Sequence, residues 1–524
     1  MVKYLSNIYL VIFVSCFHPI KAQKNQAPNI IFILADDLGF GDIQALNPES
    51  NIPTPSINLL AKQGISFTNA HSTSSVCTPS RYSFLTGRYS WRSDLKKGVI
   101  WMWDPPLIEE NRFTIGEMLH KQGYSTACIG KWHLGWEWPT KDGHSIKKNE
   151  GRNVDYDKPI MNGPITRGFD YYFGQDIPSL APHVLIENDK VITQPSAWLT
   201  SPAGWPGAME PGWQYEDLMN KITSKAIEYV KVQTVKNTNK PFFLYFSLSA
   251  PHTPIAPHGN FLHKTEVGRY GDFVYEMDHH VGRLLKTVDS LNIQENTLII
   301  FTSDNGGINA DGHNYTGKIG SLLKFGHNSN GEFRGIKSDA WEGGHRIPFI
   351  ARWPGHIIPN SSSDIVISQV DMMATFAAIT GAELPPGVAE DSYNILPALI
   401  KPSHSNIREA LVTQSGNGIL AIQKEQWKLI LSSGGGGKWT LPVGELPKLV
   451  PATKEFVWQN VQLFNLNIDF QENNNIATLH PNKILELMDL LKDYIINGKS
   501  NPARSAVQQN STNLWPEVKW VEQY

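Results

Sequence analysis

The sequence predicts an α/β protein with a large, mostly parallel central sheet flanked by helices, followed by a small C-terminal α+β domain with an antiparallel sheet. The first observation is a pair of apolar runs that end in acidic or amide residues, NIIFILADD at 29–37 and TLIIFTSDN at 297–305. A third apolar run is PFFLYFSLSAP at 241–251. Continuous apolar runs of this length are typical of strands buried on both faces, as in parallel sheets.

The N-terminal segment, residues 1–22, is predicted to be a secretory signal peptide. Lys3 gives it a positive start, residues 8–17 form a short apolar run, and Ala22 is a small residue suited to cleavage. The run is too short to span a bilayer. We therefore expect an exported protein, periplasmic if the source is a Gram-negative bacterium and otherwise secreted. Lipid attachment at Cys16 is the open alternative.

The composition excludes several classes of protein. The chain has 524 residues, 41% hydrophobic and 18% charged, with a formal net charge of −3. This length suits about two to four domains. The charge balance argues against a nucleic-acid partner, which usually requires a basic excess or stripe. Beyond the signal, no run is long and apolar enough to predict a membrane span.

The two expected domains are divided near residue 395. Residues 24–395 are predicted to form the large domain, with helices at 276–292 and 370–384 packed around the sheet. Residues 396–524 are predicted to form the small domain, with strands within 418–431 and 462–469 and a helix at 482–498. The glycine-rich segment SSGGGGK at 432–438 lacks the first glycine and the final Ser or Thr of a phosphate-binding loop, and is predicted to be a flexible hairpin tip.

The segment HSTSSVCTPSRYSFLTGRYSWR, residues 71–92, holds one of only three cysteines in the chain, Cys77. Pro79 suits the first turn of a helix, so Cys77 or Thr78 is expected near its N-cap, and Gly87 is expected to end it. Helix N-termini favour anions. Cys77 is therefore a candidate nucleophile for an anionic substrate. The alternative is a disulfide with Cys128, which otherwise has the pattern of a buried core residue.

Two pairs of oxygen-bearing side chains follow predicted strands. Asp36 and Asp37 follow the first apolar run, and Asp304 and Asn305 follow the run near residue 300. In open α/β sheets the ligand site lies at the carboxyl ends of the strands, so the pairs should meet there. Such hard oxygen donors favour Ca²⁺ or Mg²⁺.

Imidazole and ammonium groups follow the same rule. Lys131 and His133 come just after a predicted strand, and they share a side if the extended backbone persists. His252 ends the apolar run at 241–251, and Lys337 lies in a glycine-rich loop. Each one alone could be an ordinary surface group, but their recurrence at strand ends indicates a site.

These residues carry a family resemblance. The segment CTPSRYSFLTGR resembles the C-x-P-S-R signature, followed by T-G, of the formylglycine-dependent sulfatases. Further motifs resemble sulfatase motifs in the family's order, and together they cover nearly the whole mature chain: ADD, GKWHLG, GFDYYFG, SAPHTP, SDNGG and KSDAWEGGHRIPFI. The resemblance implies an alkaline-phosphatase-like fold.

The resemblance also implies a cofactor chemistry. Cys77 would be oxidised by a separate formylglycine-generating enzyme to Cα-formylglycine (3-oxoalanine), with Thr78-Pro79-Ser80-Arg81 as part of the recognised tag. One Ca²⁺ ion would be held by the modified Cys77 and by the two oxygen-bearing pairs, Asp36 with Asp37 and Asp304 with Asn305.

By the same resemblance, the remaining residues have catalytic roles. His252 resembles the acid that protonates the leaving alcohol, with Lys337 nearby. His133 resembles the base that later restores the aldehyde. Arg81 and Lys131 resemble the residues that hold the formylglycine oxygens, while Lys131, His252 and Lys337 resemble those that bind the sulfate oxygens.

The substrate is expected to be a sulfated carbohydrate. The sequences of these motifs most resemble those of N-acetylgalactosamine-6-sulfatase-like enzymes, which favours a galactose-type 6-O-sulfate as the substrate. The candidate sugar contacts are Trp101, Trp103, His183 and Arg346. Some relatives carry a GIPYS-like stretch after GFD. Here Ser179 is displaced from that pattern, and Asp176 or His183 could fill its place.

Two alternative functions stay open at this point. A phosphatase or phosphodiesterase of the same superfamily would use two zinc ions, a Ser or Thr nucleophile and more histidine ligands. A non-catalytic glycan-binding relative would keep the fold without the chemistry. The C-T-P-S-R tag at residues 77–81 argues against the first, and the complete set of motifs argues against the second.

Overall fold

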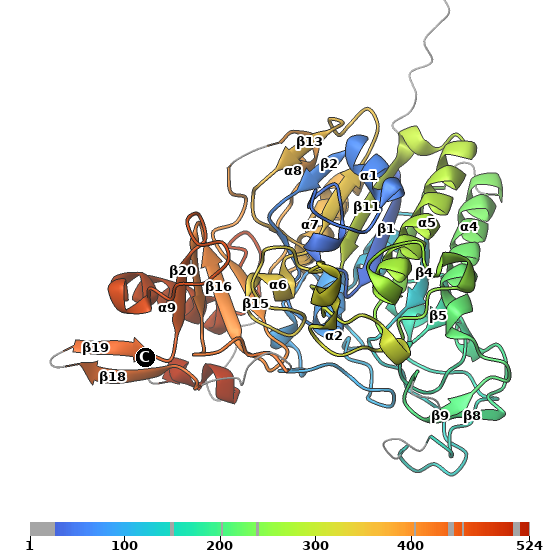
Figure 1. Cartoon of the computed structure of the whole chain (residues 1–524), viewed down its shortest axis with the longest axis horizontal. Helices are drawn as coiled ribbons and strands as arrows, with labels where there is room; N and C mark the ends of the chain where they lie inside the picture. Colours follow the sequence, from blue (N-terminus) through green and yellow to red (C-terminus); the bar gives the residue numbers. More distant parts are fainter. Residues whose placement is uncertain are drawn as a thin grey trace, which may run out of the picture.

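The computed structural model describes residues 27–146, 151–200, 203–236, 240–402, 405–438, 445–452, 455–506 and 514–522. The expected signal peptide and Cys16 lie outside these residues. A ten-stranded mixed sheet forms the centre of the molecule, in the order β13-β2-β12-β11-β1-β10-β4-β5-β6-β7 (Figure 1). Its strands are β1 Asn29–Asp36, β2 Ile65–Phe67, β4 Ser125–Lys131, β5 Tyr171–Gln175, β6 Ile186–Glu187, β7 Lys190–Val191, β10 Phe242–Pro251, β11 Thr297–Ser303, β12 Phe349–Arg352 and β13 Ser361–Ser363.

The middle of this sheet is parallel. β1 lies between β10 and β11 and is parallel to both, and β10 continues in parallel to β4 and then β5. Antiparallel strands occur toward the edges, where β12 pairs with β11 and with β2. The carboxyl ends of the four strands β11, β1, β10 and β4 therefore meet at one edge of the sheet, which is where the functional side chains gather.

Helices cover both faces of the sheet. The α-helices of the described residues are α1 Pro55–Lys62, α2 Cys77–Thr86, α3 Ile115–Lys121, α4 Leu218–Lys236, α5 Gly268–Ser290, α6 Glu342–His345, α7 Met372–Thr380, α8 Leu396–Ile400 and α9 Pro481–Ile496, of which α9 packs on the small C-terminal sheet. Alternate residues of β1 enter two separate cores. Phe32 packs with α2, α3, α7 and α8, while Ile31 and Ile33 pack with α1, α4 and α5. The Phe32 ring stacks on Phe84 of α2 with 4.1 Å between centroids, which fixes that helix against the sheet.

The C-terminal part forms a separate four-stranded antiparallel sheet, β15-β16-β17-β20, seen beside α9 on the left of Figure 1. The remaining strands of the chain are β3 Ala70–His71, β8 Ala197–Leu199, β9 Gly207–Met209, β14 Ile367–Ser368, β15 Leu411–Gln414, β16 Leu420–Lys424, β17 Trp427–Ile430, β18 Lys448–Ala452, β19 Glu455–Gln459 and β20 Gln462–Asn465. The predicted fold class, a large α/β sheet plus a small antiparallel C-terminal unit, is confirmed.

The expected helices are present with shifted bounds. α5 begins eight residues before the predicted start at 276, and α9 matches the prediction within two residues. α7 is shorter than predicted because Gly381, with φ 72°, ends it in the left-handed conformation.

The prediction of a flexible hairpin tip at 432–438 is wrong. Most of this segment is buried against the loop that follows Lys337. Ala340 N–H donates to the Gly435 carbonyl at 2.7 Å, and Lys438 N–H donates to Ser338 Oγ at 3.0 Å. A Cβ atom on Gly435 would lie 2.5 Å from the Trp341 ring. Glycine is therefore required here for close packing rather than for flexibility.

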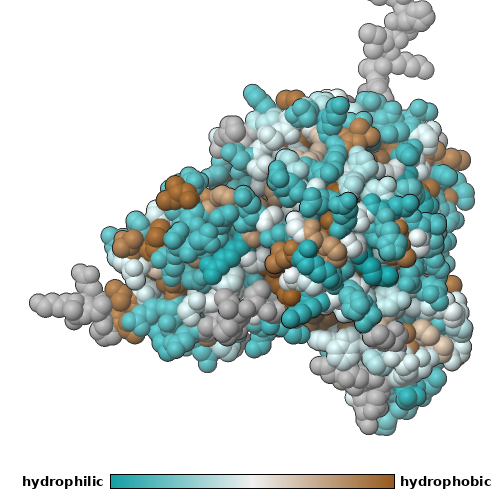
Figure 2. Space-filling model, viewed as in Figure 1, coloured by the Kyte–Doolittle hydropathy of each residue, from teal (hydrophilic) through white to brown (hydrophobic). Residues whose placement is uncertain are grey.

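The surface in Figure 2 is largely hydrophilic, with hydrophobic residues scattered in small groups. Among the residues that the structure describes, no helix combines the length and apolar character needed to cross a membrane.

Candidate active site

Four neighbouring strands deliver the polar residues of the site. Asp36 is the last residue of β1 and Lys131 is the last residue of β4. His252 follows β10, and the pair Asp304 and Asn305 follows β11. All of these strands are parallel, so their ends bring these side chains together as predicted.

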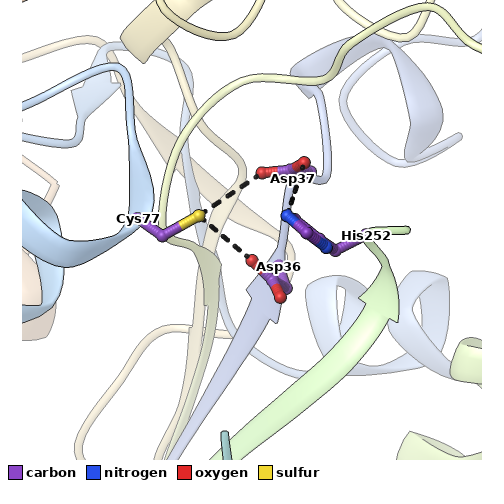
Figure 3. A group of neighbouring side chains, drawn as sticks. All are labelled: Asp36, Asp37, Cys77 and His252. Carbon is purple, nitrogen blue, oxygen red and sulfur yellow. Dashed lines mark hydrogen bonds and ion pairs between the residues drawn. The ribbon is translucent and has the colours of Figure 1, made fainter. Parts of the chain in front are cut away.

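Cys77 lies at the first position of α2, beside the aspartates (Figure 3). Val76, one residue earlier than predicted, is the N-cap, and Gly87 ends the helix with φ 65°. The Cys77 thiol lies 3.5 Å from Asp36 Oδ1 and 3.8 Å from Asp37 Oδ1. Burial and the neighbouring Asp304 raise the pKa of Cys77 far above its usual range. The unmodified thiol is therefore a poor nucleophile.

The alternative of a disulfide between Cys77 and Cys128 is wrong. Both residues are buried and both are free thiols. Cys128 lies in the middle of β4 and packs in the core, as its sequence context predicted.

Three cations neutralise the three aspartates. Lys131 Nζ lies 2.7 Å from Asp36 Oδ2, and Lys337 Nζ lies 2.8 Å from Asp37 Oδ2. Arg81 binds Asp304 Oδ2 through Nε at 3.0 Å and Nη2 at 2.8 Å. Buried charges persist only when they are paired in this way. Burial acts to raise the pKa of Asp36, but Lys131, His252 and Arg81 lower it to about 2.

The donor set fits a hard divalent cation. Asp36, Asp37, Asp304 and Asn305 present carboxylate and amide oxygens at one point of the sheet edge. Asn305 Nδ2 donates to Asp37 Oδ1 at 2.8 Å, but its buried Oδ1 has no hydrogen-bond partner among the described residues. A buried amide oxygen without a hydrogen-bond partner, placed among carboxylates, fits a ligand of Ca²⁺.

Among the described residues, the group around Asp36, Asp37 and Cys77 that could hold a metal ion contains one histidine, His252. The ligand set expected from the sequence did not include this histidine. Its Nδ1 lies 2.5 Å from the Thr253 carbonyl, so this nitrogen carries the proton that it donates. Its Nε2 faces the site, 3.7 Å from Asp37 Oδ2. A two-zinc site normally takes more imidazole ligands than this.

Residues 28–382 match the family model described as Sulfatase. The chain belongs to the sulfatase family. It is 34% identical to an N-acetylgalactosamine-6-O-sulfatase of Bacteroides thetaiotaomicron, over 90% of this chain and 93% of the relative. It is 29% identical to the N-acetylgalactosamine-6-sulfatase of Mus musculus, over 80% of this chain and 75% of the relative.

A solved structure agrees with this assignment. A protein described in connection with the metabolism of multiple glycosaminoglycans by Bacteroides thetaiotaomicron superposes with a TM-score of 0.75 and 32% identity. The match covers 89% of this chain and 99% of the other. The protein is thus a sulfuric ester hydrolase, and the alternatives of a phosphatase and of a non-catalytic relative are set aside.

His133 of this sulfatase does not lie as the extended backbone predicted. Its φ of 55° is left-handed, so the alternation that would have placed it beside Lys131 is broken. Its N–H donates to Asp176 Oδ1 at 3.0 Å, and its Nε2 donates to the Ile100 carbonyl at 3.1 Å. The remaining nitrogen, Nδ1, is buried without a hydrogen-bond partner among the described residues.

The ionisation of this histidine is set by its surroundings. Burial, followed by the positive charges of Lys131 and Arg81, lowers the pKa of His133 well below its usual range. The ring is therefore neutral and keeps a lone pair on Nδ1. Burial also raises the pKa of Asp176 to about 7.

The expected sugar-contact residues make internal contacts. His183 accepts from Tyr215 Oη at 3.0 Å. Arg346 donates to the Thr68 carbonyl at 2.8 Å and to Glu342 Oε2 at 2.8 Å. The Trp103 ring packs edge-to-face on a second tryptophan, Trp138, with 5.7 Å between centroids. The carbonyl of Ser179, the serine displaced from the relatives' pattern, accepts from the backbone of Trp205 at 2.9 Å.

The small C-terminal sheet also reaches this site, which sequence reasoning missed. Ser75, two residues before Cys77, donates its N–H to the Gln414 carbonyl at 2.9 Å. Its own carbonyl accepts from Ser338 N–H at 2.7 Å, and the Ser338 carbonyl accepts from Gly416 N–H at 2.8 Å. The nucleophile segment and the Lys337 loop are therefore joined to each other and to the end of β15.

A second buried cluster lies next to this junction. His71, Glu342 and His345 present nitrogen and oxygen atoms close enough for a metal ion. However, Lys428 Nζ lies 2.9 Å from Glu342 Oε1 and 3.1 Å from His345 Nε2. Unlike Asn305 Oδ1 in the catalytic cluster, the ligand atoms here already have partners: His71 Nδ1 and His345 Nδ1 lie 2.9 Å apart, and Arg346 also binds Glu342 at 2.8 Å. We therefore interpret the cluster as an ion-pair network.

Proposed function

We propose that this sulfatase removes 6-O-sulfate from galactose-type sugars, and from N-acetylgalactosamine in particular, in sulfated glycans. The support is the similarity to an N-acetylgalactosamine-6-O-sulfatase and to an N-acetylgalactosamine-6-sulfatase, which match over most of the chain. A structural neighbour studied in glycosaminoglycan metabolism points to the same class of substrate.

The observation that carries the mechanism is the position of Cys77. It is a buried thiol at a helix N-terminus, touching Asp36 and Asp37, and its raised pKa makes it unsuitable as a thiolate. We propose that a maturing enzyme oxidises Cys77 to formylglycine and that one Ca²⁺ is held by Asp36, Asp37, Asp304, Asn305 and the modified residue. With the ion bound, the hydrated aldehyde supplies an oxygen nucleophile, and its second hydroxyl lets the sulfate be eliminated without attack by water.

The cationic side chains bind and orient the sulfate. Lys131 and Lys337 approach the aspartates from two sides, and Lys337 Nζ lies 3.5 Å from Cys77 Sγ. Preorganised positive charge in a buried site lowers the barrier for attack on an anion. Arg81, held on Asp304, keeps the modified residue in place.

The two histidines move protons at different stages. His252 donates its Nδ1 proton to the Thr253 carbonyl and has its Nε2 toward the site; in the doubly protonated ring, which the neighbouring Asp36 and Asp37 favour against the effect of burial, Nε2 gives its proton to the oxygen of the leaving sugar. His133 has its Nε2 proton on Ile100 and a free Nδ1, so Nδ1 can take a proton when the aldehyde is restored. In each case a backbone carbonyl selects the tautomer.

We further propose that the protein is exported, because residues 1–22 have the composition of a signal peptide. In a Gram-negative cell this would place the enzyme in the periplasm, where sulfated glycan fragments are accessible.

The test combines mass, metal and activity. The protein is produced with a formylglycine-generating enzyme and assayed on 6-O-sulfated N-acetylgalactosamine. We expect intact mass to show the modified residue 77 and metal analysis to show one Ca²⁺ per chain. Cys77→Ala should abolish activity, while Cys128→Ala, a matched control in the core, should retain it. Asp304→Ala should lose metal and activity together. Full activity with an unmodified thiol, or two zinc ions per chain, would overturn the proposal.

A further inference from the structure

Two tryptophans from distant parts of the sequence meet near the active site. The rings of Trp101 and Trp205 pack edge-to-face with 5.4 Å between their centroids. Trp205 lies in the sequence between β8 and β9, the two strands labelled at the lower right of Figure 1, and 44% of it is exposed. Trp101 is half-buried. An aromatic pair that is partly open to solvent offers a flat apolar face to a ligand.

The segment that carries Trp101 is fixed to the catalytic residues. Ile100, the preceding residue, donates its N–H to Thr78 Oγ1 at 3.4 Å, and Thr78 is the neighbour of Cys77. The Ile100 carbonyl accepts the Nε2 proton of His133 at 3.1 Å. Trp101 therefore directly follows Ile100, whose backbone binds both Thr78, next to Cys77, and His133.

The segment that carries Trp205 is fixed to the same histidine by another route. Asp176, which accepts the His133 N–H, begins the loop that contains Ser179. The Ser179 carbonyl accepts from Trp205 N–H at 2.9 Å, and the Trp205 carbonyl accepts from His183 Nε2 at 2.9 Å. Both backbone polar groups of Trp205 are thus satisfied by neighbouring loops.

His183 is suited to this supporting role. It is fully buried, and Tyr215 Oη donates to its Nδ1, so the proton is on Nε2 and points to Trp205. Burial lowers the pKa of His183 to about 4, which keeps the ring neutral and this tautomer fixed at ordinary pH. The sequence prediction of His183 as a sugar contact stays a prediction; in the structure its Nε2 binds the Trp205 carbonyl.

Trp101, the first ring of the pair, also has an apolar base. Met102, Ile177, Leu180 and Ala181 form a small buried cluster against which Trp101 and Trp103 pack. The aromatic surface is therefore preorganised, and a ligand would not have to order it on binding.

We propose that Trp101 and Trp205 form a binding subsite for the sugar residue next to the sulfated one. Binding sites for small ligands combine aromatic walls with a few polar groups that fix orientation, and the apolar face of a pyranose ring packs on indole. Trp205 is the more exposed of the pair, so it contacts the sugar that lies outside the sulfate pocket. This inference rests on the proposed function and adds specificity for an oligosaccharide over a monosaccharide.

The test compares substrates of different length. The wild-type enzyme and Trp205→Ala are assayed on 6-O-sulfated N-acetylgalactosamine alone and on disaccharides with one further unsulfated sugar on either side of it. For Trp205→Ala we expect kcat/KM to fall about tenfold, equivalent to about 1.4 kcal/mol, on the disaccharide that reaches the subsite. On the monosaccharide it should change less than about twofold. Trp205→Phe should recover most of the loss. Trp198→Ala, at a half-buried tryptophan of β8 whose ring packs on Arg152, is the matched control.

The outcomes separate the subsite from the reaction itself. Equal loss on all substrates, or no loss on the disaccharides, would overturn the subsite while leaving the sulfatase mechanism intact. Turnover of neither substrate by the wild type would overturn the proposed substrate. In that case, binding of unsulfated disaccharides to Cys77→Ala, with and without Trp205→Ala, still measures the subsite by calorimetry. Affinity that does not depend on Trp205 would reject it.

Discussion

Removing the carboxylate of Asp176 should disable His133 without touching the nucleophile or the metal ligands. Asp176 is buried, and its Oδ1 accepts the backbone N–H of His133 at 3.0 Å. That N–H belongs to a residue with φ 55°, a conformation that costs a non-glycine residue about 1 kcal/mol or more. In Asp176→Ala the N–H would be buried without a partner, which costs about 1–3 kcal/mol.

A cost of about 2 kcal/mol borne by the active conformation corresponds to a rate about 30-fold lower. We therefore expect Asp176→Ala to lower kcat by roughly this factor on every sulfated substrate. The variant should also release a burst of alcohol in rapid mixing, because the impaired step follows cleavage of the ester. Thermal melting should show that the variant is folded.

Asp176→Asn separates the hydrogen bond from the charge. Asparagine keeps an acceptor oxygen, so its activity should stay within about threefold of the wild type at pH 6. Burial raises the pKa of Asp176 to about 7, so the wild-type carboxylate ionises through neutral pH and becomes a stronger acceptor for the His133 N–H. The ratio of wild-type to Asn activity should therefore rise between pH 6 and 8. An Ala variant as active as the wild type, with an unchanged pH profile, would refute the positioning role.

Three further predictions concern separate parts of the molecule. His252→Ala should slow hydrolysis of a sugar sulfate far more than that of nitrophenyl sulfate, whose acidic leaving group needs no proton, and equal slowing of both substrates would reject its role as acid. His133→Ala should slow both substrates and produce a burst of alcohol release. Gly435→Ala should push its new Cβ against the Trp341 ring, destabilise the fold by about 1–3 kcal/mol and lower both the melting temperature and kcat. Gly259→Ala, which has open space for its Cβ, should change neither. Burial raises the pKa of Asp278 from 3.8 to about 6, so the native state binds an extra proton between these pH values. As the pH rises through that window, this group therefore costs the native state about 3 kcal/mol of stability. Asp278→Asn should lack this loss when urea unfolding is compared at pH 4 and pH 7, and a variant with the wild-type pH dependence of stability would contradict the prediction.

The main features of the active site could be predicted because strand ends follow a simple rule. An apolar run that ends in Asp36 or Asp304 predicts both the strand and the side chain at its carboxyl end. When the strands are parallel, those ends lie at the same edge of the sheet, and here β1 and β11 are also neighbours, so the side chains meet. Cys77 could be placed for a similar reason, since Pro79 and Gly87 mark the start and the end of one short helix.

The orientation of His133 could not be predicted, because it depends on contacts from outside its own segment. The residues around it, GKWHLG, read as the continuation of a strand. The left-handed backbone is held by Asp176 and the ring by Ile100, which are 43 and 33 residues away in the sequence. Local pattern has no access to such contacts, so the sequence could suggest that His133 is in the site but not which of its nitrogens is free.

The contacts of the C-terminal sheet with the active site could not be predicted either, because they also come from distant parts of the sequence. They extend the active site beyond the large domain. The family match ends at residue 382, and all of the charged side chains around Cys77 precede that point. However, the backbone of the nucleophile segment is completed by Gln414, and the Lys337 loop is bound by Gly416 and packed against Gly435. A position error of about 1 Å in a reacting group can cost about a hundredfold in rate. The small sheet therefore belongs to the active site as a positioning element. In the glycine run that follows β17, Gly435 leaves room for the Trp341 ring, and Gly436 has the left-handed φ of 67°.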